Sequence, residues 1–163
     1  MTFATNEVFI TATNNQIELK VNQPNQEYKF TVAEEFQFLS GNQYSEESAE
    51  VVAWTRHSPV KGIQITDWTV SSLKVDWTSK GSGVDYKVLC TGANGTTIDT
   101  NQTSVVIEGL SPLTEYKVDV LAQNEAGWSA ENSQKASVVT LPSPPEIVAI
   151  GTLSPFVIPI NIT

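Results

Sequence analysis

Residues 104–129, SVVIEGLSPLTEYKVDVLAQNEAGWS, decide the fold of this chain. Val105 and Ile107 occupy alternate positions, which predicts a strand with one buried face. Pro112 then ends the strand, because proline has no amide hydrogen to give to a sheet. A second alternating run follows Pro112, and it ends at residues 124–127, which favour a turn. Two strands joined by a proline-containing corner are therefore expected.

Tyr116 begins the second run, and Val118 and Val120 continue it at alternate positions. In Greek-key sandwiches, a tyrosine just after such a corner buries its ring and hydrogen-bonds backward through its hydroxyl. We therefore predict a hydrogen bond between the Tyr116 hydroxyl and the backbone of residues 110–113.

The residues around this corner resemble the fibronectin type III domain family. Those that match are Leu110, Pro112, Thr114 and Tyr116 at the corner, Ala122, Asn124, Ala126, Gly127 and Ser129 after it, and Trp77 and Tyr86 upstream. The resemblance covers residues 59–142. It implies an all-β, immunoglobulin-like β-sandwich in which Trp77 lies on the second strand and Tyr86 on the third. Trp77 is expected in the core, and Trp68 on the inward face of the first strand.

The composition supports the same class. Of the 163 residues, 40% are hydrophobic, which is enough for one domain and part of another. No stretch repeats apolar residues at helical spacing over three turns, whereas Val, Ile and Thr recur in short alternating runs.

The charge excludes some classes of partner. With 18 acidic and 9 basic residues, the formal net charge is −9. Nucleic acids and anionic membrane surfaces attract clustered Lys and Arg, so we expect neither as a partner. No apolar run approaches the ~20 residues of a membrane helix, and residues 1–30 lack a signal-peptide pattern, so no membrane insertion is expected.

The corner has an earlier counterpart in the chain. Residues 24–32, PNQEYKFTV, line up with residues 112–120, PLTEYKVDV, which places Tyr28 and Tyr116 88 positions apart. We predict that the Tyr28 hydroxyl bonds to the backbone of residues 21–25. A repeat of this length is typical of tandem modules.

A second repeat follows the corner. Ile65 and Val75 correspond to Ile150 and Ile160, each 85 positions later. This pattern predicts that residues 143–163 repeat the first two strands of the sandwich.

The repeats divide the chain into the C-terminal part of one module (1–57), a complete module (58–142) and the first two strands of a further module (143–163). Two departures occur in the last part: Pro159 lies within an expected central strand, and Ile162 replaces the tryptophan. Each partial module would leave an apolar face and a sheet edge uncovered. We therefore expect either end-to-end self-association or poorly ordered ends, and Pro159 favours the second.

No catalytic, metal or cofactor site is expected. The single histidine, His57, has no cysteine or carboxylate at a metal or triad spacing, and we expect it to be a solvated linker residue. Ser82 lacks the G-x-S-x-G spacing of a nucleophile elbow, and no glycine-rich phosphate loop follows a strand.

The loop after the tyrosine strand is the candidate ligand-contact site, through Asn124, Glu125 and Trp128. It corresponds to the third antigen-binding loop of antibody domains, and an aromatic side chain at a loop tip is a good contact anchor. Trp128 could equally fold onto its own loop or onto a neighbouring module. The Arg-Gly-Asp motif of the family is absent from the chain.

Three Asn-X-Thr sequons, at Asn94, Asn101 and Asn161, are candidate N-glycosylation sites and favour an extracellular or cell-surface location. Cys90 is the sole cysteine, so no disulfide forms within the chain. An intracellular, filament-associated location is the alternative, because the family occurs in both compartments.

The resemblance implies a non-catalytic adhesion or scaffold segment of a longer multi-module protein, with a protein ligand. The alternative is an accessory module of a multidomain enzyme or receptor, such as a hydrolase or receptor phosphatase, whose catalytic domain lies outside this chain.

Overall fold

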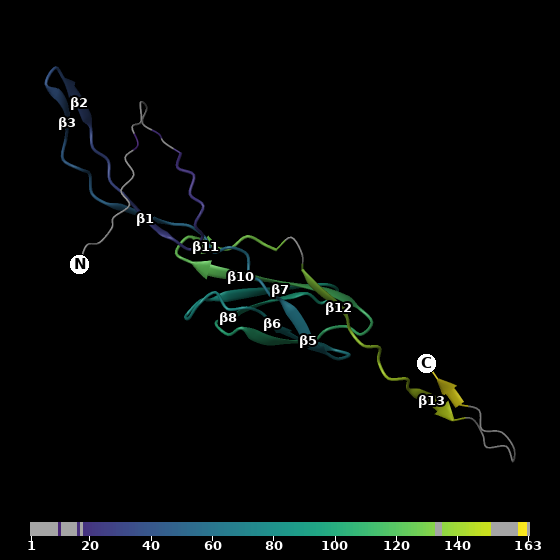
Figure 1. The fold of residues 1–163 in the computed structure, drawn as a ribbon. Coiled ribbons are helices and arrows are strands. Elements are labelled where there is room, and N and C mark those ends of the chain that lie inside the picture. The colour runs from purple at the N-terminus through teal and green to yellow at the C-terminus, as the bar shows by residue number, and fades with distance from the viewer. Residues whose placement is uncertain (1–9, 11–15, 17, 133–134, 151–159, 163) are drawn as a thin grey trace, which may run out of the picture.

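The middle of the chain forms two antiparallel sheets packed face to face (Figure 1). The computed structural model describes residues 10, 16, 18–132, 135–150 and 160–162. The smaller sheet has the order β5-β6-β9, with strands Gln64–Trp68, Ser72–Asp76 and Ser104–Glu108. In the larger sheet, β7 (Tyr86–Thr91) lies between β8 (Thr96–Thr100) and β10 (Glu115–Asn124), and β10 also pairs with β11 (Gly127–Trp128) and β12 (Ala136–Val139). The predicted immunoglobulin-like β-sandwich is confirmed.

The core between the two sheets follows the expected alternation of side chains. The buried apolar residues are Val60, Leu73, Val75, Trp77, Tyr86, Val88, Cys90, Ile107, Leu110, Tyr116, Val118, Val120 and Ala122. They recur at every second position because successive side chains of a strand point to opposite faces. The Trp77 and Tyr86 rings meet edge to face with centroids 5.5 Å apart.

Trp68 differs from this expectation, since 42% of its surface is exposed. Its register partner Leu73 is fully buried, so the strand pairing does place Trp68 on the inward side of β5. Because β5 is an edge strand and Trp68 is its last residue, the opposite sheet does not cover the indole.

The predicted tyrosine corner is present between β9 and β10. The Ser111 amide donates a hydrogen bond to the Tyr116 hydroxyl at 2.9 Å, and the ring is fully buried. The ring also lies against Gly92: a Cβ at this position would overlap the Tyr116 ring. The corner therefore depends on a small residue at the end of β7 as well as on its own sequence.

The segment before the module reproduces the backbone of this corner. β1 (Glu27–Phe30) pairs with β4 (Val51–Trp54), placing Tyr28 opposite Ala53, just as Tyr116 lies opposite Val138. The residue three positions before each tyrosine has a positive φ, 53° at Asn25 and 49° at Leu113. Such angles are uncommon outside glycine, so their recurrence at equivalent positions shows that the two corners share a backbone conformation.

A threonine at the end of the last strand anchors each corner. The Thr140 hydroxyl accepts the Thr114 amide at 3.0 Å and donates to the Ser111 carbonyl at 2.6 Å. At the equivalent places, the Thr55 hydroxyl accepts the Gln26 amide at 3.0 Å and donates to the Gln23 carbonyl at 2.6 Å. We call this pair of bonds the threonine clamp. The repeat seen in the sequence thus extends to individual hydrogen bonds.

The first corner nevertheless lacks the tyrosine bond. Within the described residues 21–28, no hydrogen bond joins the Tyr28 hydroxyl to the backbone, so that prediction is wrong. Tyr28 is only half-buried, because no second sheet covers β1 in the described part of the chain. Beyond β1 the chain continues into a separate hairpin, β2 (Glu35–Phe38) and β3 (Gly41–Tyr44).

The last described strands also repeat the module. β13 (Ile147–Ile150) pairs with β14 (Ile160–Ile162), with Ile150 opposite Ile160. The equivalent pair in the module is Ile65 opposite Val75, 85 positions earlier. Pro159, which was expected to disturb this hairpin, lies outside the described residues.

Tyr116→Phe should lower the free energy of unfolding by about 1 kcal/mol without changing the fold, because the Ser111 amide loses its partner. Urea unfolding followed by tryptophan fluorescence measures the change. Tyr44→Phe is the matched control, since 67% of Tyr44 is exposed outside the sandwich. Equal stability of the two variants would contradict the importance of the corner bond.

Candidate functional site

The predicted contact loop forms a tight turn between β10 and β11. The Asn124 side-chain oxygen accepts the Ala126 amide at 3.0 Å, and Gly127 adopts a φ of +101°. Asn124 and Gly127 then pair across the hairpin. The sequence Asn-Glu-Ala-Gly supplies both requirements, since asparagine caps its own turn and glycine tolerates positive φ.

The other end of the Asn124 side chain contacts the segment before the module. Its Nδ2 donates to the Asn25 side-chain oxygen at 2.9 Å and to the Thr55 carbonyl at 2.8 Å. Nearby, the Arg56 Nε donates to the Ala126 carbonyl at 3.2 Å. Asn25, Thr55 and Arg56 together with Asn124 and Ala126 are called the joint below. Asn25 lies in the turn before β1, Thr55 and Arg56 follow β4, and Asn124 and Ala126 lie at the end of β10 and in the turn after it, so strand ends that are distant in the sequence meet there.

The three residues predicted to contact a ligand have different environments. Glu125 is exposed at the tip, whereas Asn124 is partly buried in the joint. Trp128 is also partly buried, and the Lys87 ammonium lies 4.5 Å from the centroid of its ring. This cation–π contact joins the loop to β7. The tip of the loop therefore presents the exposed carboxylate of Glu125, whereas the indole of Trp128 already contacts Lys87.

The sequence model of one family, described as "Fibronectin type III domain", matches residues 58–139, half of the chain. The chain belongs to the fibronectin type III domain family. The solved structures that it resembles include the FN1–FN3 domains of chicken CNTN1, with 18% identity, a TM-score of 0.45, and coverage of 73% of this chain and 42% of that chain.

Two further similar structures are single domains. The fibronectin type III domain of the human collagen alpha-1(XX) chain is 19% identical, with a TM-score of 0.47 and coverage of 54% of this chain and 88% of that one. The FN5 domain of Drosophila Lar is 17% identical, with a TM-score of 0.46 and coverage of 53% and 98%.

His57, directly before the fibronectin type III module, is buried, with only 7% of its surface exposed. The prediction of a solvated linker residue is therefore wrong. Burial lowers the pKa of the imidazole, and the positive charge of Lys80 lowers the same pKa further. The Lys80 ammonium donates to the Ser58 hydroxyl at 2.8 Å, which holds this lysine beside the linker. The neutral form of His57 is thus the one that the fold accommodates.

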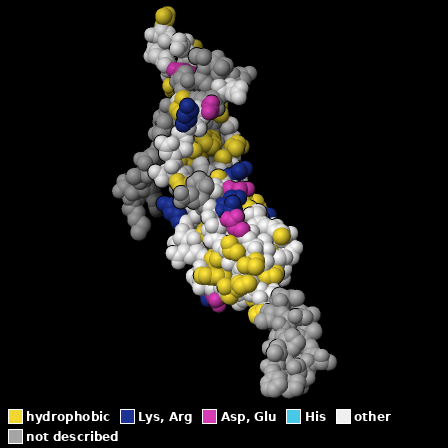
Figure 2. All heavy atoms as spheres, turned by 90° about the vertical axis from the view of Figure 1, so that its right-hand side faces the viewer, with side chains coloured by type: hydrophobic (Ala, Val, Ile, Leu, Met, Phe, Trp, Pro, Cys, Tyr) yellow, Lys and Arg dark blue, Asp and Glu magenta, His cyan; other side chains and the backbone are white. Residues whose placement is uncertain are grey.

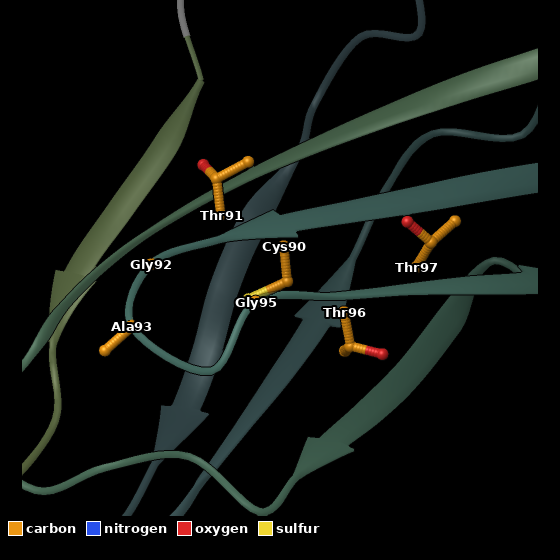
Figure 3. Close-up of a pocket in the computed structure, with 7 residues that line it drawn as sticks. All are labelled: Cys90, Thr91, Gly92, Ala93, Gly95, Thr96 and Thr97. Atoms are coloured by element: carbon orange, nitrogen blue, oxygen red, sulfur yellow. The ribbon is translucent and has the colours of Figure 1, made fainter.

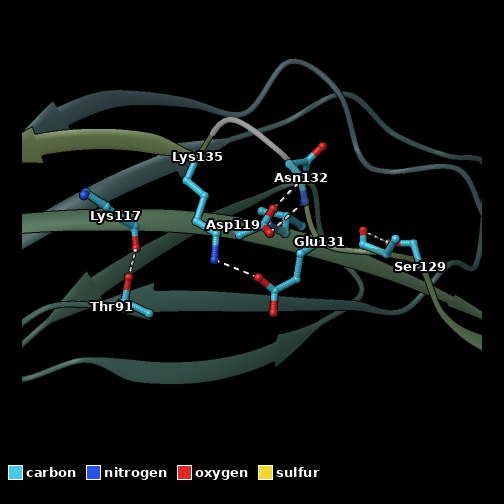
Figure 4. Close-up of polar contacts among 9 residues, drawn as sticks. Thr91, Lys117, Asp119, Ser129, Glu131, Asn132 and Lys135 are labelled. Carbon is cyan, nitrogen blue, oxygen red and sulfur yellow. Dashed lines mark hydrogen bonds and ion pairs between the residues drawn. The ribbon is translucent and has the colours of Figure 1, made fainter.

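Asp119, on the outer face of β10, was not identified from the sequence. It is fully buried, because residues 129–132 cross over it (Figure 4). Its carboxylate accepts the Asn132 amide at 3.0 Å and the Asn132 side-chain Nδ2 at 2.6 Å. An aspartate in a Tyr-Lys-Val-Asp-Val alternation ordinarily faces water, so no local signal predicts this cover. Asp119 therefore holds the segment 129–132, which leaves the loop, against β10.

A shallow depression lies over the β7–β8 turn and is lined by small side chains from Cys90 to Thr97 (Figure 3). The thiol of Cys90 is buried, and burial raises its pKa, so the reactive thiolate is disfavoured. No charged side chain lines the depression. Nothing in this place combines a nucleophile with a base.

The described part of the chain also lacks the features of a metal site and of a membrane-spanning helix. It contains no group of three or more His, Cys, Asp or Glu that could hold a metal ion. It also forms no helix of the length and apolarity needed to cross a membrane. The predictions of no catalytic residue, no metal and no cofactor stay predictions.

Of the three sequons, Asn94 and Asn101 lie on exposed turns of the module. The Asn94 amide donates to the Ser111 hydroxyl at 2.9 Å. The structure does not describe the side chain of Asn161. Glycosylation at these sites remains a prediction.

The stability of the chain should fall as the pH decreases from 7 to 5. His57 has a lowered pKa in the folded state, so its contribution is complete above the unfolded pKa of about 6.5 and is lost as the pH falls through the folded pKa. Thermal unfolding at half-unit pH steps measures this. Because the chain has one histidine, His57→Gln should flatten the dependence in this window. An unchanged slope in His57→Gln would contradict the assignment.

Proposed function

We propose that this chain is a non-catalytic scaffold or adhesion segment of a longer multi-module protein. In this proposal, residues 1–57 end one fibronectin type III module, residues 58–142 form a complete one, and residues 143–163 begin a third. The repeated threonine clamp and the repeated pairing of Ile150 with Ile160 support that division. Members of this family serve as modules of larger proteins and generally contact other proteins.

The observation that carries the proposal is the joint. A linker that only tethers two modules needs no specific bonds between them. Here the end of the preceding segment makes three hydrogen bonds with the β10–β11 turn, through Asn25, Thr55 and Arg56. Each bond of this kind contributes on the order of 1 kcal/mol. Together they favour one orientation of successive modules, as a scaffold that presents binding surfaces at a set spacing requires.

Protein contacts would use the surfaces that the joint leaves free. Glu125 remains exposed beside the joint, and apolar side chains gather on one face of the module (Figure 2). The exposed large apolar residues of the module include Trp68, Val106, Leu113 and Val139. The exposed sequons Asn94 and Asn101 favour an extracellular or cell-surface setting for these contacts.

Asn124→Asp tests the joint sharply. The carboxylate can still accept the Ala126 amide and keep the turn, but it cannot donate to Asn25 and Thr55. Backbone residual dipolar couplings of residues 25–56 and 64–139 should fit one common alignment tensor in the unmodified chain. In Asn124→Asp they should need two, because the segments then reorient independently.

Glu125→Gln is the matched control, since it also changes one charge on the same turn but removes no bond of the joint. This variant should keep the single tensor. Two independent tensors in the unmodified chain would overturn the proposal of a fixed scaffold.

A further inference from the structure

His57 lies in the linker that carries the joint. The residue before it, Arg56, belongs to the joint, and its Nε donates to the Ala126 carbonyl at 3.2 Å. The residue after it, Ser58, accepts a hydrogen bond from the Lys80 ammonium at 2.8 Å. The buried imidazole therefore lies on a stretch of backbone whose neighbours on both sides are held against the module.

Lys80 is held in turn by the core of the module. Its backbone amide donates to the Tyr86 hydroxyl at 2.8 Å, and Tyr86 is fully buried. A proton on His57 would place a second positive charge beside the Lys80 ammonium. Relief of that repulsion requires either that the linker moves or that the bond from Lys80 to Ser58 breaks. Both changes release the linker from the module.

The charged groups around His57 offer an imidazolium no partner. Burial lowers the pKa of His57, and the charge of Lys80 lowers it further. Arg56 adds another cation in the linker itself. The carboxylates of Asp85, before β7, and Glu125, in the β10–β11 turn, are exposed and do not raise this pKa. The intact joint therefore favours the neutral imidazole, and it is weakened as the pH falls below the ordinary imidazole pKa of about 6.5.

We propose that protonation of His57 opens the joint and frees the preceding segment to reorient against the module. This deepens the proposed function and rests on it, because only a joint that is fixed at neutral pH can be released. The joint consists of three hydrogen bonds, whereas the module is held by its buried core, so the joint gives way first. Both parts keep their own folds while the relation between them changes.

Backbone residual dipolar couplings at about pH 7.5 and about pH 5, on either side of the ordinary imidazole pKa, provide the first test. Couplings of residues 25–56 and 64–139 should fit one alignment tensor at the higher pH and need two at the lower. Each segment should still fit its own structure at both. One tensor at both pH values would overturn this inference and leave the proposed function standing. Two tensors already at the higher pH would overturn both.

His57→Gln makes the test specific, because glutamine cannot take up a proton in this range and the chain has no other histidine. This variant should keep one tensor at both pH values. A joint that still opened at about pH 5 in His57→Gln would respond to another group, which would overturn the assignment to His57.

The reverse measurement keeps the histidine. Coupling between two equilibria is reciprocal, so a variant that opens the joint should have a His57 pKa closer to about 6.5. Asn124→Ser opens it without a change of charge. A serine hydroxyl can accept the Ala126 amide and keep the turn, but it cannot replace both hydrogen bonds to Asn25 and Thr55. Titration of the single imidazole by NMR measures the pKa directly.

Ala126→Ser is the matched control, since it changes the same turn while Ala126 contributes only backbone atoms to the joint. The pKa of His57 should be the same in this variant as in the unmodified chain. Each unit by which Asn124→Ser raises the pKa corresponds to a tenfold coupling between protonation and opening. An unchanged pKa in Asn124→Ser, or an equal rise in Ala126→Ser, would overturn the proposal.

Discussion

The hydrogen bond from the Ser111 amide to the Tyr116 hydroxyl lies where the chain crosses from one sheet to the other. It holds a fully buried ring at the start of β10, between the corner and Gly92 at the end of β7. Because a Cβ at Gly92 would overlap the Tyr116 ring, β7 and β10 cannot be repositioned separately. The spacing of the larger sheet and the closure of the core therefore depend on this single placement.

Comparison of the two corners separates what is local from what is tertiary. Both corners contain a residue with positive φ. In both, the threonine clamp joins the corner to the end of the strand that pairs with the tyrosine strand. Among the residues that the structure describes, the tyrosine bond occurs in residues 58–139 alone, where a second sheet holds the ring inward. The clamp thus needs only the pairing of adjacent strands, whereas the tyrosine bond needs the whole sandwich.

The elements that sequence could predict are those fixed by neighbours along the chain. Alternation predicted the core strands, and the corner motif predicted the bond of Tyr116. Burial of His57 and Asp119 was missed, because it depends on which distant segment covers each side chain. For the same reason Asn124 could be identified as a turn residue, while its partners in the joint could not.

Asn124 links the shape of its own turn to the placement of the preceding segment. Its oxygen fixes the turn, and its nitrogen uses both hydrogens on Asn25 and Thr55. A planar amide cannot rotate one end without moving the other. Any contact at Glu125 that changed the turn would therefore also change the orientation of Nδ2 and weaken the joint. In this arrangement, the shape of the β10–β11 turn and the placement of the preceding segment are coupled through one side chain.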